Sequence, residues 1–370
     1  MHFDLSKPQK LFADSVRDFC QREFSAKRVR EFMATEFAMD DRLWQEFAEQ
    51  GWLGLHIDEE YEGLGLGTVD VAVLAEEFGR ACVSGPWLAT TWGVTLLQAV
   101  GGSAAAEYLP TIINGDVKIA VGALEDSGSW SLCVDSMESV LKDGTLNGHK
   151  QLVQHAKQAD QLLLPVQVNG EIGLVIVPTN ANGVTLEKTP GIDATRTLYR
   201  VELNGVSVGA DQLIASGAEA EAAWKRALQT MSVVAAAEML GLQQWMLEAT
   251  VEYAKTRKQF DKPIGSFQSV QHQCAEILQL ADGARAAVWY AAWAVEEKTE
   301  DVDQAVGVAK AYTSDAARRA GNLSVQSHGG IGFTWEHDLH LYYKRARADE
   351  FLFGDVAFHL QNLGAAALAN

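Results

Sequence analysis

Residues 253–268, YAKTRKQFDKPIGSFQ, bring four basic side chains close together: Lys255, Arg257, Lys258 and Lys262. The whole chain has 30 Lys and Arg against 49 Asp and Glu, a formal charge of −19, so this basic segment is a local exception. Guanidinium and ammonium groups bind phosphate oxygens, but they also complement the carbonyl end of a helix. The residue types therefore allow two interpretations, an anion-binding site or a solvated helix end.

Two histidines could bind a metal. His337 and His340 in EHDLH are three residues apart, so one helix face could carry both. No third ligand is placed with them, and the cysteines Cys20, Cys82, Cys133 and Cys274 are scattered without a C-x-x-C pair. The sequence therefore predicts neither a metal site nor a disulfide framework.

Length and charge limit the class of protein. The 370 residues, 48% of them hydrophobic, are enough for two or three globular domains. A charge of −19 argues against nucleic acid and against an anionic membrane surface as partners. The sequence has no apolar run of membrane-spanning length and no signal-peptide pattern, so we expect a cytoplasmic enzyme or enzyme subunit.

The first third of the chain has helical patterns. Ser6 and Gln9 fit a capping box before an apolar repeat at helical spacing. A second helix is predicted from Asp41 through Trp52, and a third over residues 69–80 after the glycine-rich turn EEYEGLGLG.

The middle of the chain has strand patterns, and the last part is helical again. Asp143-Gly144 and Asn169-Gly170 each lie between β-type segments, and residues 200–208 alternate like a strand. Helices are predicted at Ala218–Thr256, Ser269–Glu297, Val302–His328 and Glu336–Ala367. The predicted fold class is α+β: an N-terminal helical domain (1–116), a middle β barrel (117–213) and a C-terminal helical bundle (214–370).

Four segments in this order resemble the acyl-CoA dehydrogenase family over nearly the whole chain. They are GWLGLHIDEEYEGLGLG with AEEFGRA, LNGHKQLVQHAKQAD, YAKTRKQFDKPIGSFQ and QSHGGIGFTWEHDLH. The resemblance implies the family's fold with a C-terminal four-helix bundle, FAD as cofactor, an acyl-CoA substrate and electron-transfer flavoprotein as acceptor. In this chemistry a base removes the α-proton of the thioester and the flavin accepts the β-hydrogen as hydride.

The resemblance also gives the basic segment a role. The arginine matching Arg257 faces the FAD pyrophosphate in the family, and in family tetramers these groups contact the FAD of a neighbouring subunit. The implied cofactor-binding residues are Arg257, Phe260 and Gln268 in one segment and Gln326, Gly329 and Gly330 in the other.

The family's catalytic base is missing at both of its usual positions. Phe353 stands where one group of members carries the glutamate, and Met231 stands near the alternative position. The remaining candidates are Glu238 and Asp355. Glu238 lies two helical turns after Met231 and is either a displaced base or an arginine-paired structural residue. Asp355 is either a base or the N-cap of a helix.

The predicted β domain also departs from the family at positions near the flavin ring. Leu124 replaces a threonine in the loop LEDSGS, while Leu152 and Gln154 replace the ring-stacking tryptophan and the hydrogen-bonding threonine. Groups that a chain supplies to its own flavin are therefore changed, whereas groups for a neighbour's FAD are kept.

Three hypotheses follow. The chain resembles the base-less subunit of a heteromeric bacterial acyl-CoA dehydrogenase of the steroid side-chain type, with a homologous partner in an α2β2 assembly. Alternatively, it is a self-sufficient dehydrogenase, active as a self-tetramer, with Glu238 or Asp355 as the base. A third hypothesis is a related flavin oxidase or nitro-compound oxidase on the same fold, but it would also need a carboxylate base, so Phe353 counts against it.

Overall fold

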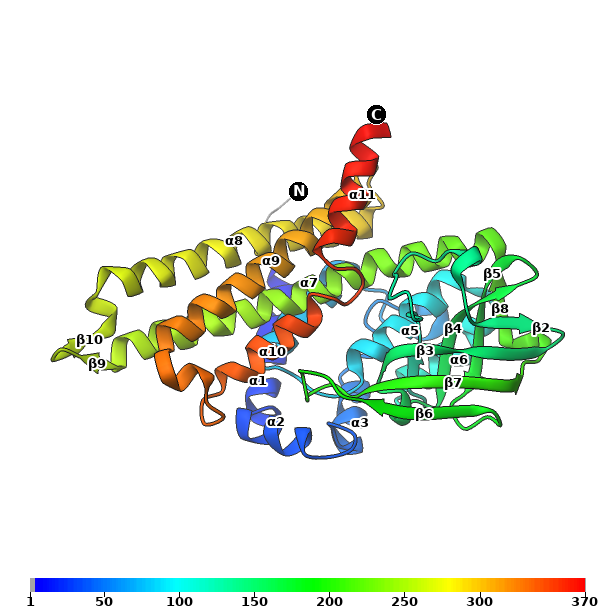
Figure 1. Cartoon of the computed structure of the whole chain (residues 1–370), viewed down its shortest axis with the longest axis horizontal. Coiled ribbons are helices and arrows are strands. Elements are labelled where there is room, and N and C mark those ends of the chain that lie inside the picture. The colour runs from blue at the N-terminus through cyan, green and yellow to red at the C-terminus, as the bar shows by residue number, and fades with distance from the viewer. Residues whose placement is uncertain (1–3, 370) are drawn as a thin grey trace. The chain divides into compact units, whose positions relative to one another are not determined.

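The computed structural model describes residues 4–369 and divides the chain into two compact units. The first unit comprises residues up to Arg30, Thr68–Val83 and the segment from Ser232 onward, and the second comprises Glu31–Gly67 and Ser84–Met231. The order of helices, then strands, then helices confirms the predicted α+β class (Figure 1). The division at 116 and 213 remains a prediction about domain boundaries.

The first unit is helical. Figure 1 shows α7, α8 and α9 running alongside one another, with the small β9–β10 hairpin at one end of α7 and α8. Its elements are α1 (Lys7–Glu23), most of α2 (Ala26–Met33), α4 (Thr68–Arg80), the second part of α7 (Gly217–Thr256), β9 (Lys258–Gln259), β10 (Lys262–Pro263), α8 (Gln268–Glu297), α9 (Val302–His328), α10 (Leu339–Asp349) and α11 (Val356–Ala369).

Local sequence explains how these helices begin and pack. The side chain of Ser6 accepts from the backbone N–H of Gln9 and the Gln9 side chain accepts from that of Ser6, which confirms the predicted capping box. A Cβ on Gly79 would lie 2.0 Å from the carbonyl oxygen of Glu238, and one on Gly241 would lie 1.8 Å from that of Glu76. Glycine at both positions therefore lets α4 and α7 cross with their backbones in contact.

The predicted helix Glu336–Ala367 is wrong in one respect, because the chain breaks between α10 and α11. Phe353 and Gly354 have φ angles of 56° and 100°, in the left-handed region that ends a helix. Asp355 then caps α11, since its Oδ1 accepts from the backbone N–H of Phe358 at 2.8 Å. This confirms the N-cap interpretation of Asp355.

The second unit combines helices with one sheet. Its elements are α3 (Asp41–Glu49), α5 (Trp87–Val100), α6 (Gly102–Ile113), β1 (Ile119–Val121), β2 (Val140–Lys142), β3 (Thr145–Gln154), β4 (Gln161–Val168), β5 (Glu171–Pro178), β6 (Val184–Thr189), β7 (Leu198–Ser207), β8 (Leu213–Ser216) and the start of α7. The strand order is β6-β7-β3-β2-β4-β5-β8, and β1 pairs with β4. The helix predicted to reach Trp52 ends at Glu49, because Gly51 adopts a φ of 74°.

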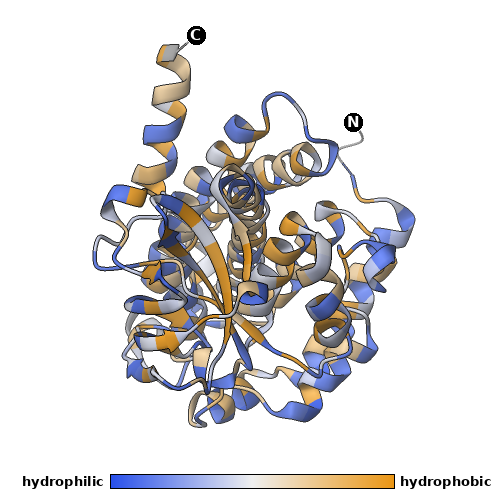
Figure 2. Ribbon diagram, turned by 90° about the vertical axis from the view of Figure 1, so that its right-hand side faces the viewer, coloured by the Kyte–Doolittle hydropathy of each residue, from blue (hydrophilic) through white to orange (hydrophobic). Residues whose placement is uncertain are grey.

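Both predicted hairpins are present. Asp143-Gly144 joins β2 to β3, and Asn169-Gly170 joins β4 to β5, with all four residues at positive φ. Strands β4 and β5 are buried over most of their length, and Figure 2 shows apolar residues concentrated along central strands of the sheet. The buried sheet therefore supports the loop between β1 and β2 and the neighbouring strand β3.

Candidate functional site

The basic segment forms the β9–β10 hairpin at the end of α7. Phe260 and Asp261 occupy its two-residue turn, both at positive φ (53° and 61°), as such tight turns require. This turn leaves the Phe260 side chain 85% exposed, with one edge toward the ring of Phe267 at 5.9 Å. The hairpin therefore presents an aromatic ring outward instead of burying it.

Arg257 lies at the base of this hairpin. Its backbone N–H donates to the carbonyl of Tyr253, and its carbonyl accepts from the N–H of Ile264 at 2.8 Å, so the backbone is fixed. Its side chain is exposed, and within residues 4–369 no group forms a hydrogen bond or ion pair with the guanidinium. The five N–H donors of Arg257 are therefore available to an anion.

The second predicted segment lies at the same end of the first unit. Gly329 ends α9 with a φ of 64°, and a Cβ on Gly329 or Gly330 would meet no atom within 4 Å. The rings of Tyr253 and His328 stack at 4.5 Å, which joins the end of α7 to the end of α9. Ser327 donates to Gln273 at 2.6 Å, which joins α9 to the start of α8.

This end is also apolar at its surface. Phe333 and Trp335, in the turn after α9, are 76% and 66% exposed, and Ile331 is partly exposed beside them. Gln268 and Gln326 are exposed on α8 and α9. Large exposed aromatic side chains near an unpaired guanidinium are typical of a surface that another molecule covers.

Neither position at which we expect the family's base carries a carboxylate. Phe353 is 1% exposed, and its carbonyl accepts from the hydroxyl of Ser232 at 3.3 Å and lies 3.0 Å from Nε2 of His359. In the second unit, Met231 is buried, with its sulfur 3.7 Å from the hydroxyl of Thr95.

Glu238 is held in a buried ion pair. Its Oε1 accepts from the guanidinium of Arg345 at 2.7 Å, and both side chains are almost fully buried. Arg345 also donates to the carbonyl of Val83 at 3.0 Å. The arginine-paired interpretation of Glu238 is therefore the one the geometry fits.

In the second unit, the loop between β1 and β2 is fastened to the sheet by a buried glutamate. Glu125 accepts from Lys150 Nζ at 2.6 Å and from the backbone N–H groups of Glu138 and Ser139 at 2.6 and 3.0 Å. Burial would raise the pKa of this carboxyl, but Lys150 and the backbone donors hold the pKa below its usual value. The charges of Glu125 and Lys150 are thus paired with each other inside the fold.

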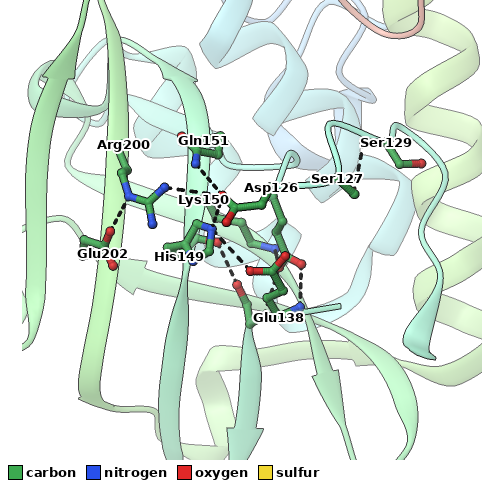
Figure 3. A network of polar contacts seen from close by, with 11 residues as sticks. Asp126, Ser127, Ser129, Glu138, His149, Lys150, Gln151, Arg200 and Glu202 are labelled. Atoms are coloured by element: carbon green, nitrogen blue, oxygen red, sulfur yellow. Dashed lines mark hydrogen bonds and ion pairs between the residues drawn. The ribbon is translucent and has the colours of Figure 1, made fainter. Parts of the chain in front are cut away.

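Asp126 continues this network at the surface (Figure 3). Its Oδ1 lies 2.8 Å from Nε2 of His149, accepts from Gln151 at 2.7 Å and lies 3.5 Å from Arg200. In the described part of the chain, Asp126, Glu138 and His149 are the one group whose ligand atoms lie close enough to share a metal ion, within 4.8 Å. The donors from Gln151 and Arg200 already occupy Asp126, so this cluster acts as a hydrogen-bond network.

The residues at the positions expected near a flavin ring offer few free hydrogen-bonding groups. Leu124 pairs with Gln151 through the backbone, Leu152 sits exposed in an irregular part of β3 at a φ of 52°, and the amide oxygen of Gln154 is buried without a partner in the structure described. Sequence reasoning missed the Glu125–Lys150 pair. The Glu-Asp pair in LEDSGS and the Lys in GHKQ were visible, but only the fold brings them together.

The comparisons with known proteins agree with this geometry. Family models for the acyl-CoA dehydrogenase N-terminal domain and C-terminal domain match residues 6–116 and 222–368. Acyl-CoA dehydrogenase IpdE2 of Mycolicibacterium smegmatis is 31% identical over 363 residues, which cover 98% of this chain and 99% of the relative. Acyl-CoA dehydrogenase FadE28 of Mycobacterium tuberculosis is 28% identical, covering 99% and 98%.

Solved structures show the same fold. A variant of the Tcur3481–Tcur3483 steroid ACAD has a TM-score of 0.87 and 26% identity, covering 98% of this chain and 99% of that one. The ChsE4–ChsE5 complex from Mycobacterium tuberculosis has a TM-score of 0.90 at 24% identity, with both chains fully covered.

The fold and the site thus define the class of protein as a flavoprotein oxidoreductase of the acyl-CoA dehydrogenase kind. The chain belongs to the acyl-CoA dehydrogenase family, whose members use FAD. Within residues 4–369, no helix combines the length and the apolar character needed to cross a membrane.

Residues of the first unit fit part of FAD. The unpaired guanidinium of Arg257 and the open backbone at Gly329 and Gly330 suit phosphate and adenosine groups. Leu152 supplies neither an aromatic ring nor a donor at the position expected for the flavin ring.

Proposed function

We propose that this chain is one subunit of a hetero-oligomeric acyl-CoA dehydrogenase. It contributes Arg257 and its neighbours to an FAD held mainly by a homologous partner, and that partner supplies the α-proton base. The assembly desaturates an acyl-CoA thioester and passes electrons to electron-transfer flavoprotein. The observation that carries this proposal is Phe353, which occupies the family's base position with its ring buried.

The loop around Phe353 is built to stay in place. Lys310 is fully buried and donates to the carbonyls of Glu350 and Gly354 at 3.0 and 2.9 Å. Together with the contacts of Ser232 and His359 to the Phe353 carbonyl, these bonds fix the backbone on both sides of the ring. The adjacent carboxylate, Asp355, caps α11, so the loop presents no base.

Glu238 is also poorly suited to remove a proton. A general base must come within about 3 Å of the proton that it takes, directly or through one water. The carboxylate of Glu238 is 3% exposed and already binds Arg345. Freeing it would break a buried ion pair, which costs about 3–5 kcal/mol.

The chain's own contribution is cofactor binding and assembly. FAD, when bound, supplies the hydride acceptor. Arg257 offers a planar set of donors to pyrophosphate oxygens, and the side-chain-free surface at Gly329 and Gly330 allows close approach. Phe260, Phe333 and Trp335 provide the apolar surface that a homologous subunit covers.

A flavin spectrum of the purified chain tests the proposal. We expect the chain alone to be colourless and a complex with a co-expressed homologous subunit to contain flavin. A yellow chain that is bleached by acyl-CoA in the absence of any partner contradicts the proposal and supports the self-sufficient enzyme.

Replacing Glu238 with Gln separates the two hypotheses further. In the complex we expect the Glu238→Gln variant to keep both FAD and turnover, because the base lies in the partner. If Glu238→Gln abolishes turnover while FAD remains bound, Glu238 is the base. Asp355→Asn gives the matching test of the other candidate, since asparagine also caps helices.

The acyl group is proposed from the relatives. The 26% identity to a protein described as a steroid ACAD supports CoA esters of steroid side chains as first substrates to test. Faster flavin reduction by a straight-chain acyl-CoA of similar length would count against this choice.

A further inference from the structure

Three aromatic rings connect the two segments proposed to contact FAD. Tyr253 lies on α7, four residues before Arg257, and His328 ends α9, directly before Gly329. Their rings stack at a centroid distance of 4.5 Å and an angle of 24°. His337 meets the ring of His328 at 4.6 Å and that of Tyr253 at 6.4 Å, in both cases edge-on.

The contacts of the two histidines in this stack suit neutral rings. His328 is 3% exposed, its Nδ1 lies 2.7 Å from the carbonyl of Ser324, and its Nε2 is buried without a hydrogen-bond partner among the residues described. Nδ1 of His337 accepts from the backbone N–H of Leu339 at 3.1 Å, so this nitrogen carries no proton. Burial lowers the pKa of both rings from 6.5.

The charges beside the stack act on His337 in opposite directions, since Asp338 raises its pKa and Arg30 lowers it, and burial still leaves this pKa below 6.5. Arg30 of α2 pairs with Asp338, and Lys344 of α10 lies 3.9 Å over the ring of Trp335. His340 meets the ring of the same tryptophan edge-on at 4.6 Å, and burial lowers its pKa. The carboxylate whose charge raises the pKa of His337 is Asp338, which is also bound to Arg30, and the neighbouring Glu336 is exposed.

We propose that the Tyr253–His328–His337 stack is a positioning element that holds the Arg257 and Gly329–Gly330 segments in register, and that protonation of its histidines opens it. The consequence for FAD rests on the function proposed above. The stack itself is a property of this chain alone.

The direction of the pH effect follows from the neutral rings. An opened segment exposes its histidines, which then bind protons near their ordinary pKa of 6.5. The closed stack is therefore favoured fully above that pH and loses stability as the pH falls through it. Each unit of pKa difference between the closed and open states corresponds to about a tenfold change in the opening equilibrium.

Hydrogen exchange of the chain without FAD tests the stack. We expect peptides from residues 253–268 and 326–338 to exchange faster at pH 5.5 than at pH 7.5 by about tenfold, after correction for the intrinsic exchange rate. Peptides from the middle of α9 should not change. The His337→Asn variant, whose amide oxygen can still accept from Leu339, should reduce this ratio several-fold.

His272→Asn is the matched control, because His272 is an exposed histidine on α8. It should keep the wild-type ratio. A second variant, Tyr253→Leu, removes the stacking ring and should give fast exchange in both segments at both pH values. The proposal is overturned if His337→Asn keeps the wild-type pH dependence, or if the wild type shows none.

A parallel measurement separates this result from the proposed function. Release of FAD from the complex is followed over the same pH range. If exchange responds as expected while FAD release does not, the stack is proton-sensitive but the segments do not contact FAD, and the proposed cofactor contact is wrong.

Discussion

Two regions of this protein carry charged side chains, and they use them in opposite ways. At the β9–β10 end of the first unit, Arg257 is exposed and unpaired among the residues described, beside the exposed ring of Phe260. In the loop after β1 of the second unit, Glu125 is paired with Lys150 and hydrogen-bonded to the backbone. The first region keeps its polar groups available, whereas the second satisfies them internally.

Under the proposed function, this difference separates the half of the site that serves a partner's FAD from the half expected to hold the chain's own flavin. An unpaired exposed arginine costs the isolated chain little, because water solvates its charge. A buried carboxylate must find donors, and Glu125 finds them in the loop backbone at Glu138 and Ser139 and in Lys150 of β3. The loop that resembles a flavin-contacting segment connects β1 to β2 and is fixed to β3 by the Glu125–Lys150 pair.

The largest effect is expected from breaking the buried pair. Lys150→Met keeps the length of the side chain but leaves the carboxylate of Glu125 buried without its cation. Because such a loss costs about 3–5 kcal/mol, we expect the free energy of unfolding to fall by that amount. Urea denaturation followed by tryptophan fluorescence measures it.

Lys157→Met is the control for this change. Lys157 pairs with Glu36 at 2.6 Å, but both side chains are about half exposed (50% and 52%). The same substitution should leave the free energy of unfolding unchanged within error, because exposed ion pairs contribute little. Equal destabilisation by both variants would mean that burial of the Glu125–Lys150 pair is not what fixes the loop.

The next effect is on cofactor affinity. Arg257→Ala removes an exposed side chain, so the stability of the chain should not change. In the complex with its partner we expect FAD to bind about 1–3 kcal/mol more weakly, the usual value of a lost charge-assisted hydrogen bond. Equilibrium dialysis of FAD measures this change.

Lys255→Ala provides the comparison for Arg257→Ala. Lys255 lies two residues earlier and is also exposed, with Glu252 at 3.8 Å. If both variants weaken FAD binding equally, the effect is one of general charge, and Arg257 has no specific contact with the pyrophosphate.

The sequence predicts much of the fold because local patterns determine it. Asn169-Gly170 specifies its hairpin, and Ser6 with Gln9 specifies the start of α1. The break between α10 and α11 was not predicted. The break depends on Phe353, a residue type that rarely adopts positive φ. Side chains of Ser232, on α7, and His359, on α11, contact its carbonyl, and these contacts form only in the folded chain.

The candidate site divides in the same way. Arg257, Gln326 and the glycines could be assigned by resemblance because they lie in continuous segments. The Glu238–Arg345 pair joins residues 107 positions apart, and the Glu125–Lys150 pair joins residues 25 apart. Such pairings follow from how α7, α10 and the strands pack, so residue types and spacing alone do not predict them.

The smallest effect is expected at the exposed edge of the loop network. Asp126 accepts hydrogen bonds from Gln151 and His149, which lower the pKa of its carboxyl. The Asp126→Asn variant keeps the shape and one acceptor oxygen but removes the charge, and water can solvate the exposed groups left behind. We therefore expect its urea midpoint at pH 7 to match the wild type, in contrast to Lys150→Met.

The pH dependence of stability gives a second comparison. A carboxyl group with a lowered pKa stabilises the fold above that pKa and ceases to do so as the pH falls through it. The wild type should therefore lose slightly more stability in acid than the Asp126→Asn variant does. If Asp126→Asn instead destabilises the protein as much as Lys150→Met, the surface contacts of Asp126 hold the loop as firmly as the buried Glu125–Lys150 pair, and the loop is not fixed by burial alone.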